Sequence, residues 1–217
     1  MLLPIRDISA HRVRAPATVA LVALSVLAFA MQLGNGLTAT VWKAGVIPWE
    51  LTHAEAIELP SRLHPLLTPL ASMFLHGGLI HLAGNMLYLW VFGPNVEKAF
   101  GRTRFVLLYL GAGVAGMLAH AFSTPHSVLP AVGASGAVAG ILGAHLLLYP
   151  RGRVRALLFL VIFLSIVDVP SLLLIGVWAA LQAAAGFTGA TGSIAVFAHL
   201  AGFVVGCVAA RHRRPPS

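Results

Sequence analysis

The stretch AVGASGAVAGILGA, residues 131–144, holds one hydroxyl, Ser135, in a run of glycines and small apolar residues. Gly136 and Gly140 are four residues apart, so on a helix they share one face and allow a neighbouring helix to approach closely. Taken alone, Ser135 would be interpreted as a packing residue or a helix cap. Whether this hydroxyl has another function depends on the polar residues elsewhere in the chain.

The composition indicates a polytopic membrane protein. Of the 217 residues, 59% are hydrophobic and 9% are charged, whereas roughly a quarter of the residues of soluble domains are charged. The formal net charge is +8, but the basic residues form short clusters between apolar segments, so we expect no nucleic-acid partner. The first apolar stretch follows basic residues without a convincing cleavage site, which favours a retained span over a signal peptide.

Apolar stretches of membrane-spanning character predict six spans, at about 16–33, 74–93, 104–122, 135–149, 156–185 and 194–210. The fifth contains Asp168 and Pro170 and is interpreted as one kinked or tilted helix. We therefore expect an all-α membrane protein, a six-transmembrane-helix bundle. It would form a single domain over residues 1–217, with its core at about 16–210 and short basic cytoplasmic tails at 1–15 and 211–217.

The positions of Lys and Arg predict the orientation. All but two of the 14 basic residues precede span one, lie between spans two and three or four and five, or follow span six. The exceptions, Lys43 and Arg62, lie in the long connection between spans one and two. Because cytoplasmic segments carry the excess of positive charge, both termini are predicted to be cytoplasmic in the cell (inner or plasma) membrane.

Polar residues open spans two, four and six, and such residues are costly within a bilayer and mark functional sites. They are His76, His81 and Asn85, then Ser135, then His199. These three spans run in the same direction, so the polar residues share a depth in the outer half of the membrane. His199 lies on the face of Gly202 and Gly206, so close packing of spans four and six would bring His199 toward Ser135.

A serine beside a neutral histidine is sufficient for nucleophilic acyl transfer. The imidazole accepts the hydroxyl proton as the serine attacks a carbonyl, and then returns it to the leaving amine. His81, Asn85 and a backbone N–H at the start of the Ser135 helix could stabilise the oxyanion. Asp168 is expected in the middle or inner half of span five, paired with backbone donors or Ser165. The residues therefore favour a Ser–His dyad.

Three segments, HGGLIHLAGN, GASGA and AHLAGFVVG, resemble in the same order the signature motifs of rhomboid intramembrane serine proteases of bacterial type. VEKAFG, residues 96–101, also resembles the inner loop of that family. The resemblance implies a serine endopeptidase with a six-span core that cleaves transmembrane segments of single-pass proteins near the outer face of the bilayer. It implies no cofactor and no metal.

The resemblance also assigns roles to individual residues. Ser135 would be the nucleophile and His199 the general base, while His81 and Asn85 would form the oxyanion hole with the Ser135 backbone N–H. The supporting residues would be His76, Gly133, Gly136 and Gly202. The chain departs from the family in having Ala139 where an aromatic residue often packs against the catalytic histidine, and its outer loop lacks a clear Trp–Arg pair.

Two other functions stay open. A catalytically silent rhomboid-like chaperone would share the fold, although the presence of both Ser135 and His199 argues against it. A membrane protein that binds haem through His81, His199 or His145 belongs to a different class and would leave Ser135 and Asn85 without a role. A zinc protease is disfavoured because the chain has no H-E-x-x-H motif.

The remaining polar residues are expected to be structural. His120, His126 and His145 match no motif, and His53 and His64 are predicted to face solvent. Trp178 and Gln182, four residues apart, are interpreted as a packing or gating element near a helix end, with packing preferred. The glycine-containing stretch at about 186–193 is predicted to form a lid.

Overall fold

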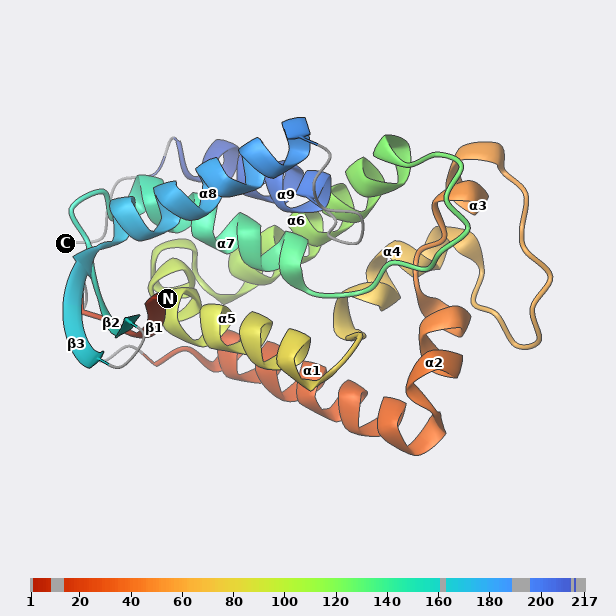
Figure 1. The fold of residues 1–217 in the computed structure, drawn as a ribbon, viewed down its shortest axis with the longest axis horizontal. Helices are drawn as coiled ribbons and strands as arrows, with labels where there is room; N and C mark the ends of the chain where they lie inside the picture. Colours follow the sequence, from red (N-terminus) through yellow and green to blue (C-terminus); the bar gives the residue numbers. More distant parts are fainter. Residues whose placement is uncertain (1, 9–13, 161–162, 189–195, 212, 214–217) are drawn as a thin grey trace.

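The computed structural model describes residues 2–8, 14–160, 163–188, 196–211 and 213, and most of these residues are helical (Figure 1). The elements in chain order are β1 (Leu2–Asp7), α1 (Pro16–Asn35), α2 (Leu37–Ala44), α3 (Pro48–His53), the 3₁₀ turn η1 (Pro65–Leu67), α4 (Thr68–Ala71), the 3₁₀ turn η2 (Ser72–Phe74), α5 (Leu79–Phe100), α6 (Arg102–Ser123), α7 (Ser135–Leu148), β2 (Arg153–Leu160), β3 (Phe163–Pro170), α8 (Ser171–Thr188) and α9 (Val196–Ala210).

Several helices have membrane-spanning character. By length and composition α1 and α6 can each cross a bilayer, and Pro65–Phe74 together with α5 forms a third candidate that is bent by 77°. The helices α7, α8 over Ser171–Ala185, and α9 are apolar but shorter. The structure thus supports a helical membrane protein, and the number of spans stays a prediction.

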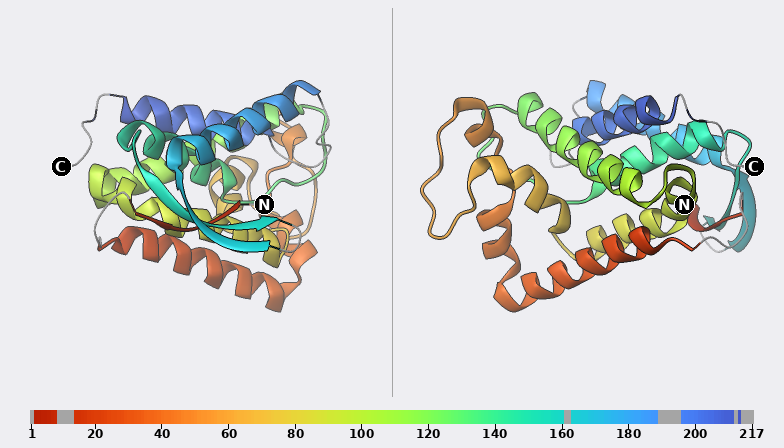
Figure 2. Two further views of the ribbon diagram at one scale, coloured as in Figure 1. Left: turned by 60° about the vertical axis from the view of Figure 1, so that its left-hand side comes forward. Right: turned by 180° about the vertical axis from the view of Figure 1, so that it is seen from behind.

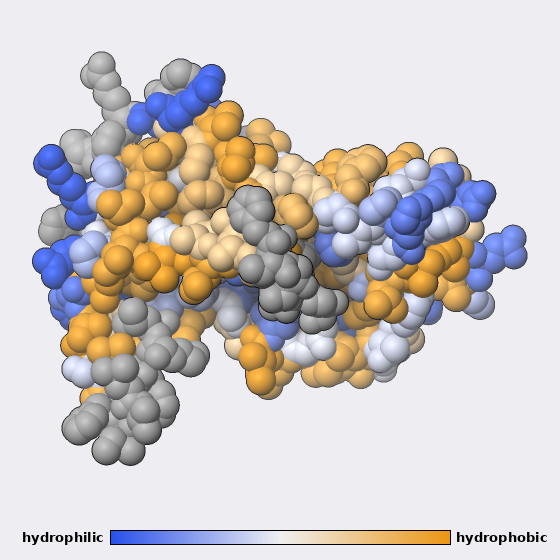
Figure 3. Space-filling model, turned by 45° about the horizontal axis from the view of Figure 1, so that its top comes forward, coloured by the Kyte–Doolittle hydropathy of each residue, from blue (hydrophilic) through white to orange (hydrophobic). Residues whose placement is uncertain are grey.

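The surface agrees with a bilayer location. In Figure 3 hydrophobic residues cover much of the middle of the molecule, and hydrophilic residues gather mainly toward its two ends. Leucines on α1 are also exposed, including Leu27 at 61% and Leu33 at 64%. In water such a surface would aggregate, whereas lipid tails would cover it.

The helix α7 lies at the centre of the bundle and is buried along most of its length. It packs against α9 through small residues: a Cβ atom on Gly202 would collide with the Gly136 carbonyl oxygen, and one on Gly206 would collide with the Gly140 carbonyl oxygen. The predicted close contact between these two helices is therefore observed. It places the start of α9 beside the start of α7.

The prediction of a single helix over residues 156–185 is wrong in its first part. β2 and β3 form an antiparallel hairpin in which Arg153 lies opposite Pro170, and only α8 continues as a helix. In β2 the buried Val154 and Ala156 alternate with exposed arginines, which is the periodicity of a strand. Pro170 has no N–H to donate and disfavours the helical conformation of the residue before it. A helix therefore cannot run through Pro170 easily, and α8 begins at Ser171.

Two further predictions are wrong. Residues 1–15 are not only a tail, because Leu2–Asp7 forms a strand, and the protein is not all-α, because it contains a small sheet. β1 pairs antiparallel with β2, so a three-stranded sheet in the order β1-β2-β3 covers one end of the bundle (Figures 1 and 2). Asp7 at the end of β1 is buried, and its carboxylate accepts hydrogen bonds from Asn95 and from His145, whose Nε2 lies 2.6 Å away. His145 is thus structural, as predicted.

Asp168 was predicted to lie inside a helix, but it lies in the strand β3. Its carboxylate accepts hydrogen bonds from Arg155, with Nε at 2.9 Å and Nη2 at 3.1 Å. Both side chains are accessible to solvent, at 48% for Arg155 and 33% for Asp168. These hydrogen bonds and the positive charge of the guanidinium lower the pKa of Asp168. The ion pair spans the hairpin, and the expected pairing with Ser165 is replaced by this contact.

Candidate active site

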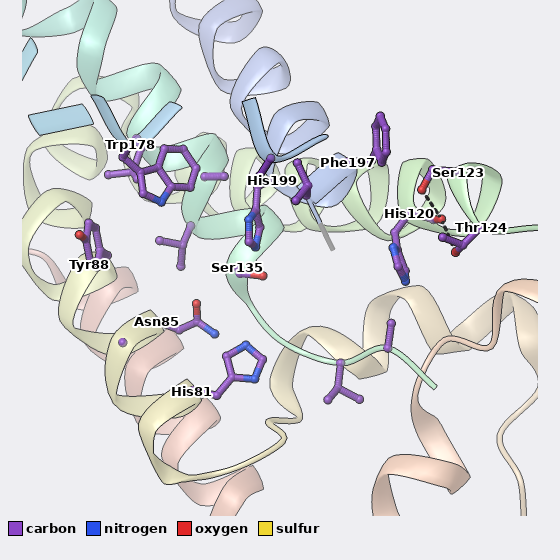
Figure 4. Close-up of a pocket in the computed structure, with 18 of the residues that line it drawn as sticks. His81, Asn85, Tyr88, His120, Ser123, Thr124, Ser135, Trp178, Phe197 and His199 are labelled. Atoms are coloured by element: carbon purple, nitrogen blue, oxygen red, sulfur yellow. Dashed lines mark hydrogen bonds between the residues drawn. The ribbon is translucent and has the colours of Figure 1, made fainter. Parts of the chain in front are cut away.

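Four of the five predicted polar residues line one cavity of about 900 Å³ between α5, α6, α7, α8 and α9. His81 and Asn85 come from α5, Ser135 from α7 and His199 from α9 (Figure 4). These four residues are up to 118 positions apart in the sequence, and the fold brings them to the walls of the same cavity. The cavity also includes apolar and aromatic side chains such as Tyr88 and Trp178.

Ser135 is the first residue of α7 and is half-buried. The backbone before it turns at Gly133, whose φ of +130° is rarely adopted by other residues. A Cβ atom at this position would lie 2.6 Å from His81 Cε1. Gly133 therefore allows both the turn into α7 and the close approach of His81 to the serine loop.

Several hydrogen-bond donors surround Ser135. The α7 N-terminus has no side-chain cap, so the N–H groups of its first turn lack partners within the helix. Asn85 is 7% exposed, and its Nδ2 has no hydrogen-bond partner among the described residues. Such buried donors are costly unless they find an acceptor, and the oxygen of a tetrahedral intermediate would be one.

His81 can be oriented by its own loop. The Gly77 N–H donates to His81 Nδ1 over 3.4 Å, which leaves Nε2 as the protonated nitrogen of a neutral ring. A Cβ on Gly133 would lie 2.7 Å from this Nε2, so the N–H is beside the serine loop. His81 is therefore placed as a donor toward Ser135.

His76 lies behind His81 and does not line the cavity. Its fully buried ring contacts His81 edge-on, with ring centroids 5.2 Å apart. Gln32 of α1 holds its backbone, because Gln32 Nε2 donates to the His76 carbonyl over 3.2 Å and the His76 N–H donates to Gln32 Oε1 over 2.9 Å. These contacts fix the position of the segment that precedes α5.

His199 lies in the first turn of α9, and Figure 4 shows its ring pointing toward Ser135. Its Nδ1 lies 2.8 Å from Gln182 Oε1, and the ring of Trp178 is 6.0 Å away between centroids. Both partners belong to α8. With Nδ1 engaged, Nε2 is the nitrogen left to act on the serine.

The sequence identified Trp178 and Gln182 as a pair but assigned them to packing, and their contact with His199 was missed. The signal was an amide and an indole four residues apart on an otherwise apolar helix. Trp178 also supplies an aromatic neighbour for His199, which the small, buried Ala139 cannot provide.

The other histidines differ in their surroundings. His120 was expected to be only structural, yet it lines the cavity. His53 and His64 are exposed, as predicted. His126 is exposed, and its ring lies 5.4 Å from that of His53. The predicted lid at about 186–193 falls largely outside the described residues, because 189–195 are not described.

The long connection between α1 and α5 is held together by an ion pair between Arg62 and Glu50. Arg62 donates from Nε to Glu50 Oε1 over 2.7 Å, and its Nη1 donates to the Trp42 carbonyl oxygen. The side chains of Arg62 and Glu50 are nearly completely buried, at 5% and 0% exposed. This connection is therefore a folded part of the molecule beside the cavity.

Fold and cavity together define a helical membrane protein with a serine, histidines and amide donors around one internal site. Comparison with known families agrees: a model of the rhomboid domain matches residues 61–215. The chain belongs to the rhomboid family.

Individual relatives extend this comparison. The chain is 48% identical over 81 residues to Rhomboid protease GluP of Bacillus subtilis (strain 168), which covers 37% of this chain and 15% of that protein. It is 34% identical over 149 residues to Rhomboid protein 1, mitochondrial, of Saccharomyces cerevisiae, covering 63% of this chain and 39% of that protein. It is 37% identical over 81 residues to Putative rhomboid protease YdcA of B. subtilis, covering 37% of this chain and 39% of that protein.

The chain spans between 15% and 39% of the length of these three relatives. Two of them are named as proteases. Family membership therefore supports a function of the intramembrane-protease type, in agreement with the apolar helices.

Proposed function

We propose that this protein is an intramembrane serine endopeptidase that cleaves transmembrane segments of single-pass membrane proteins by a Ser135–His199 dyad. The observation that carries the proposal is the shared cavity: His81, Asn85, Ser135 and His199 line it together, and His199 has its Nδ1 engaged by Gln182. A packing role for Ser135 would not require two histidines around it, nor an amide donor that has no partner among the described residues.

The chemistry follows from the donors and acceptors in the cavity. Ser135 Oγ attacks the scissile carbonyl carbon while His199 Nε2 accepts the hydroxyl proton. The resulting oxyanion faces the first-turn N–H groups of α7, Asn85 Nδ2 and the His81 N–H. Collapse of this intermediate breaks the C–N bond, and His199 returns the proton to the leaving amine. A water molecule, deprotonated by His199, then hydrolyses the acyl-enzyme.

The substrate must expose a peptide bond that a helix normally shields by hydrogen bonding. We therefore expect substrates with helix-weakening and small residues near the outer end of their membrane span. They would enter sideways between helices, past α8, into the part of the cavity lined by Tyr88 and Trp178.

The proposed orientation places the cavity toward the outer face of the cell membrane and both termini in the cytoplasm. The basic residues support this orientation. Arg6, Arg153 and Arg155 belong to the sheet, and the C-terminal ends of α5 and α9, where further basic residues lie, are at the same end of the molecule (Figure 1). Lys43 lies in α2 and Arg62 follows α3, and both helices lie at the opposite end (Figure 1). An excess of positive charge marks the cytoplasmic side.

The test is cleavage of a labelled single-pass helix by the purified full chain in liposomes. Wild type is expected to release one product, and Ser135→Ala and His199→Ala to release none while melting at the wild-type temperature. Equal cleavage by all three proteins would identify a contaminating protease and contradict the proposal. Absence of product from wild type, across several substrates with helix-weakening residues, would instead favour a silent rhomboid-like chaperone. A haem absorbance band in the purified protein would favour the haem-binding class.

A further inference from the structure

The residue Gln182 contacts the proposed general base from a helix to which no catalytic role has been assigned. It lies on α8, and its Oε1 is 2.8 Å from His199 Nδ1. We propose that Gln182 is a positioning residue that fixes the tautomer and the orientation of His199. This inference rests on the proposed protease function and adds a positioning residue to the proposed Ser135–His199 dyad.

The direction of the hydrogen bond determines the chemistry. An amide oxygen only accepts, so the hydrogen of the neutral imidazole must be on Nδ1. The lone pair is then on Nε2, and Figure 4 shows the His199 ring turned toward Ser135. The opposite tautomer would present an N–H to the serine and could not take its proton. Gln182 thus selects the form of His199 that acts as a base.

A buried carboxylate has this function in Ser-His-Asp triads, where it orients the imidazole and stabilises the imidazolium that forms. Here no Asp or Glu is among the described residues that line the cavity. An amide can orient the ring in the same way but carries no charge. It is also easier to place on an apolar helix than a carboxylate, because burying an amide costs less than burying an ion.

Trp178 reinforces the same geometry. It precedes Gln182 by four residues, so both side chains project from one face of α8. The Trp178 ring restricts the His199 ring, with centroids 6.0 Å apart, while the Gln182 amide fixes its rotation. The position of α8 therefore contributes directly to the alignment of the base.

The experiment compares the full chain in liposomes as wild type, Gln182→Met, Gln182→Glu and Leu181→Ala. Methionine keeps the length of glutamine but offers no comparable acceptor, whereas an ionised glutamate can only accept. Leu181 is on the same helix and 65% exposed, so it serves as the matched control. For each protein kcat and KM are measured against pH with one labelled single-pass helix, together with the melting temperature.

We expect Gln182→Met to lower kcat about 10-fold to 100-fold while KM changes less than about twofold, because only the alignment of the base is lost. Gln182→Glu is expected to restore most of this activity. Its negative charge would favour the protonated imidazole, so the acidic limb of the kcat profile should move to higher pH. The other titratable groups that act on His199 are His81 and His120; all variants keep them, so the movement reports residue 182.

Wild-type kcat in Gln182→Met, or a change confined to KM, would overturn the inference. Equal losses in Gln182→Met and Gln182→Glu, with an unchanged pH midpoint, would show that Gln182 is merely structural. These outcomes leave the Ser135-dependent cleavage of the wild type intact. Cleavage by Ser135→Ala at the wild-type rate would instead overturn the proposed function itself, so the two failures are distinguishable.

Discussion

At the scale of single residues, Gly133 shows how backbone conformation positions the proposed catalytic groups. It combines a φ of +130° with the contact to the His81 ring. The Gly133 N–H also donates to the Ser72 carbonyl over 2.9 Å, which anchors the turn to the segment before α5. A larger residue would have to displace either the ring or the turn, and both contribute to the proposed oxyanion site.

Gly133→Ala is expected to lower kcat at least about 10-fold. It should also destabilise the protein by about 1–3 kcal/mol, because alanine at this φ is strained. Cleavage kinetics and thermal unfolding measure the two effects. Gly111→Ala is the control, since no atom lies within 4 Å of the position of its Cβ. If Gly133→Ala behaved like Gly111→Ala, the turn would not position the site.

Sequence patterns identified the polar residues of the site but not all of their partners. Ser135, His199, His81 and Asn85 could be predicted to share a cavity because polar groups are rare in apolar spans and these spans run in the same direction. The contact between Gln182 and His199 depends on the rotation of α8 about its axis, which no single-sequence pattern determines. The same holds for the pairing of His145 with Asp7, a residue of the N-terminal strand.

At the scale of elements, the contact between α7 and α9 brings Ser135 and His199 together. The backbones approach so closely that side chains at Gly202 and Gly206 would collide with carbonyl oxygens of α7. Close packing of this kind tolerates small residues only, and insertion of methyl groups forces helices apart.

Gly202→Val should therefore lower stability by about 1–3 kcal/mol. It should also lower kcat more than Gly133→Ala does, since it separates the two members of the proposed dyad. Gly176→Val on α8 is the matched control, because its Cβ would contact nothing within 4 Å. Thermal unfolding in detergent and liposome cleavage provide the readouts. A stable and fully active Gly202→Val would show that this contact does not align the dyad.

The hairpin was the element that the sequence did not predict. A run of apolar residues without strict alternation is typical of both buried strands and buried helices, and length then favoured a helix. The structure shows two strands, Arg153–Leu160 and Phe163–Pro170, and the first of them pairs with β1, which lies about 150 positions earlier in the chain. Non-local pairing of this kind leaves little trace in the local sequence.

At the scale of the whole molecule, most of the basic residues and the start of α7, which carries Ser135, belong to opposite ends of the helical bundle. The sheet with its arginines covers one end, while Ser135 is at the end of α7 farther from that sheet (Figure 1). The distribution of Lys and Arg predicts which end of the molecule faces the cytoplasm, and this prediction does not depend on whether segment 153–170 is helical or extended. The number of spans depends on the exact helix lengths, which the sequence pattern predicts less well.

Cysteine labelling tests the orientation. In a Cys207→Ala background, Lys43→Cys and Arg151→Cys each place one thiol at an exposed position near opposite ends of the molecule. In intact spheroplasts a membrane-impermeant maleimide is expected to label Lys43→Cys, and to label Arg151→Cys only after permeabilisation. Labelling of both variants in intact spheroplasts would place the two ends on the same side of the membrane.

The most direct measurement of Ser135 as a nucleophile is its labelling by a fluorophosphonate probe, followed by mass spectrometry of the modified peptide. We expect a phosphonyl adduct on Ser135 in the wild-type protein and none in His199→Ala, because the hydroxyl reacts only when a base accepts its proton. An adduct on another serine, or equal labelling of Ser135 without His199, would contradict the dyad.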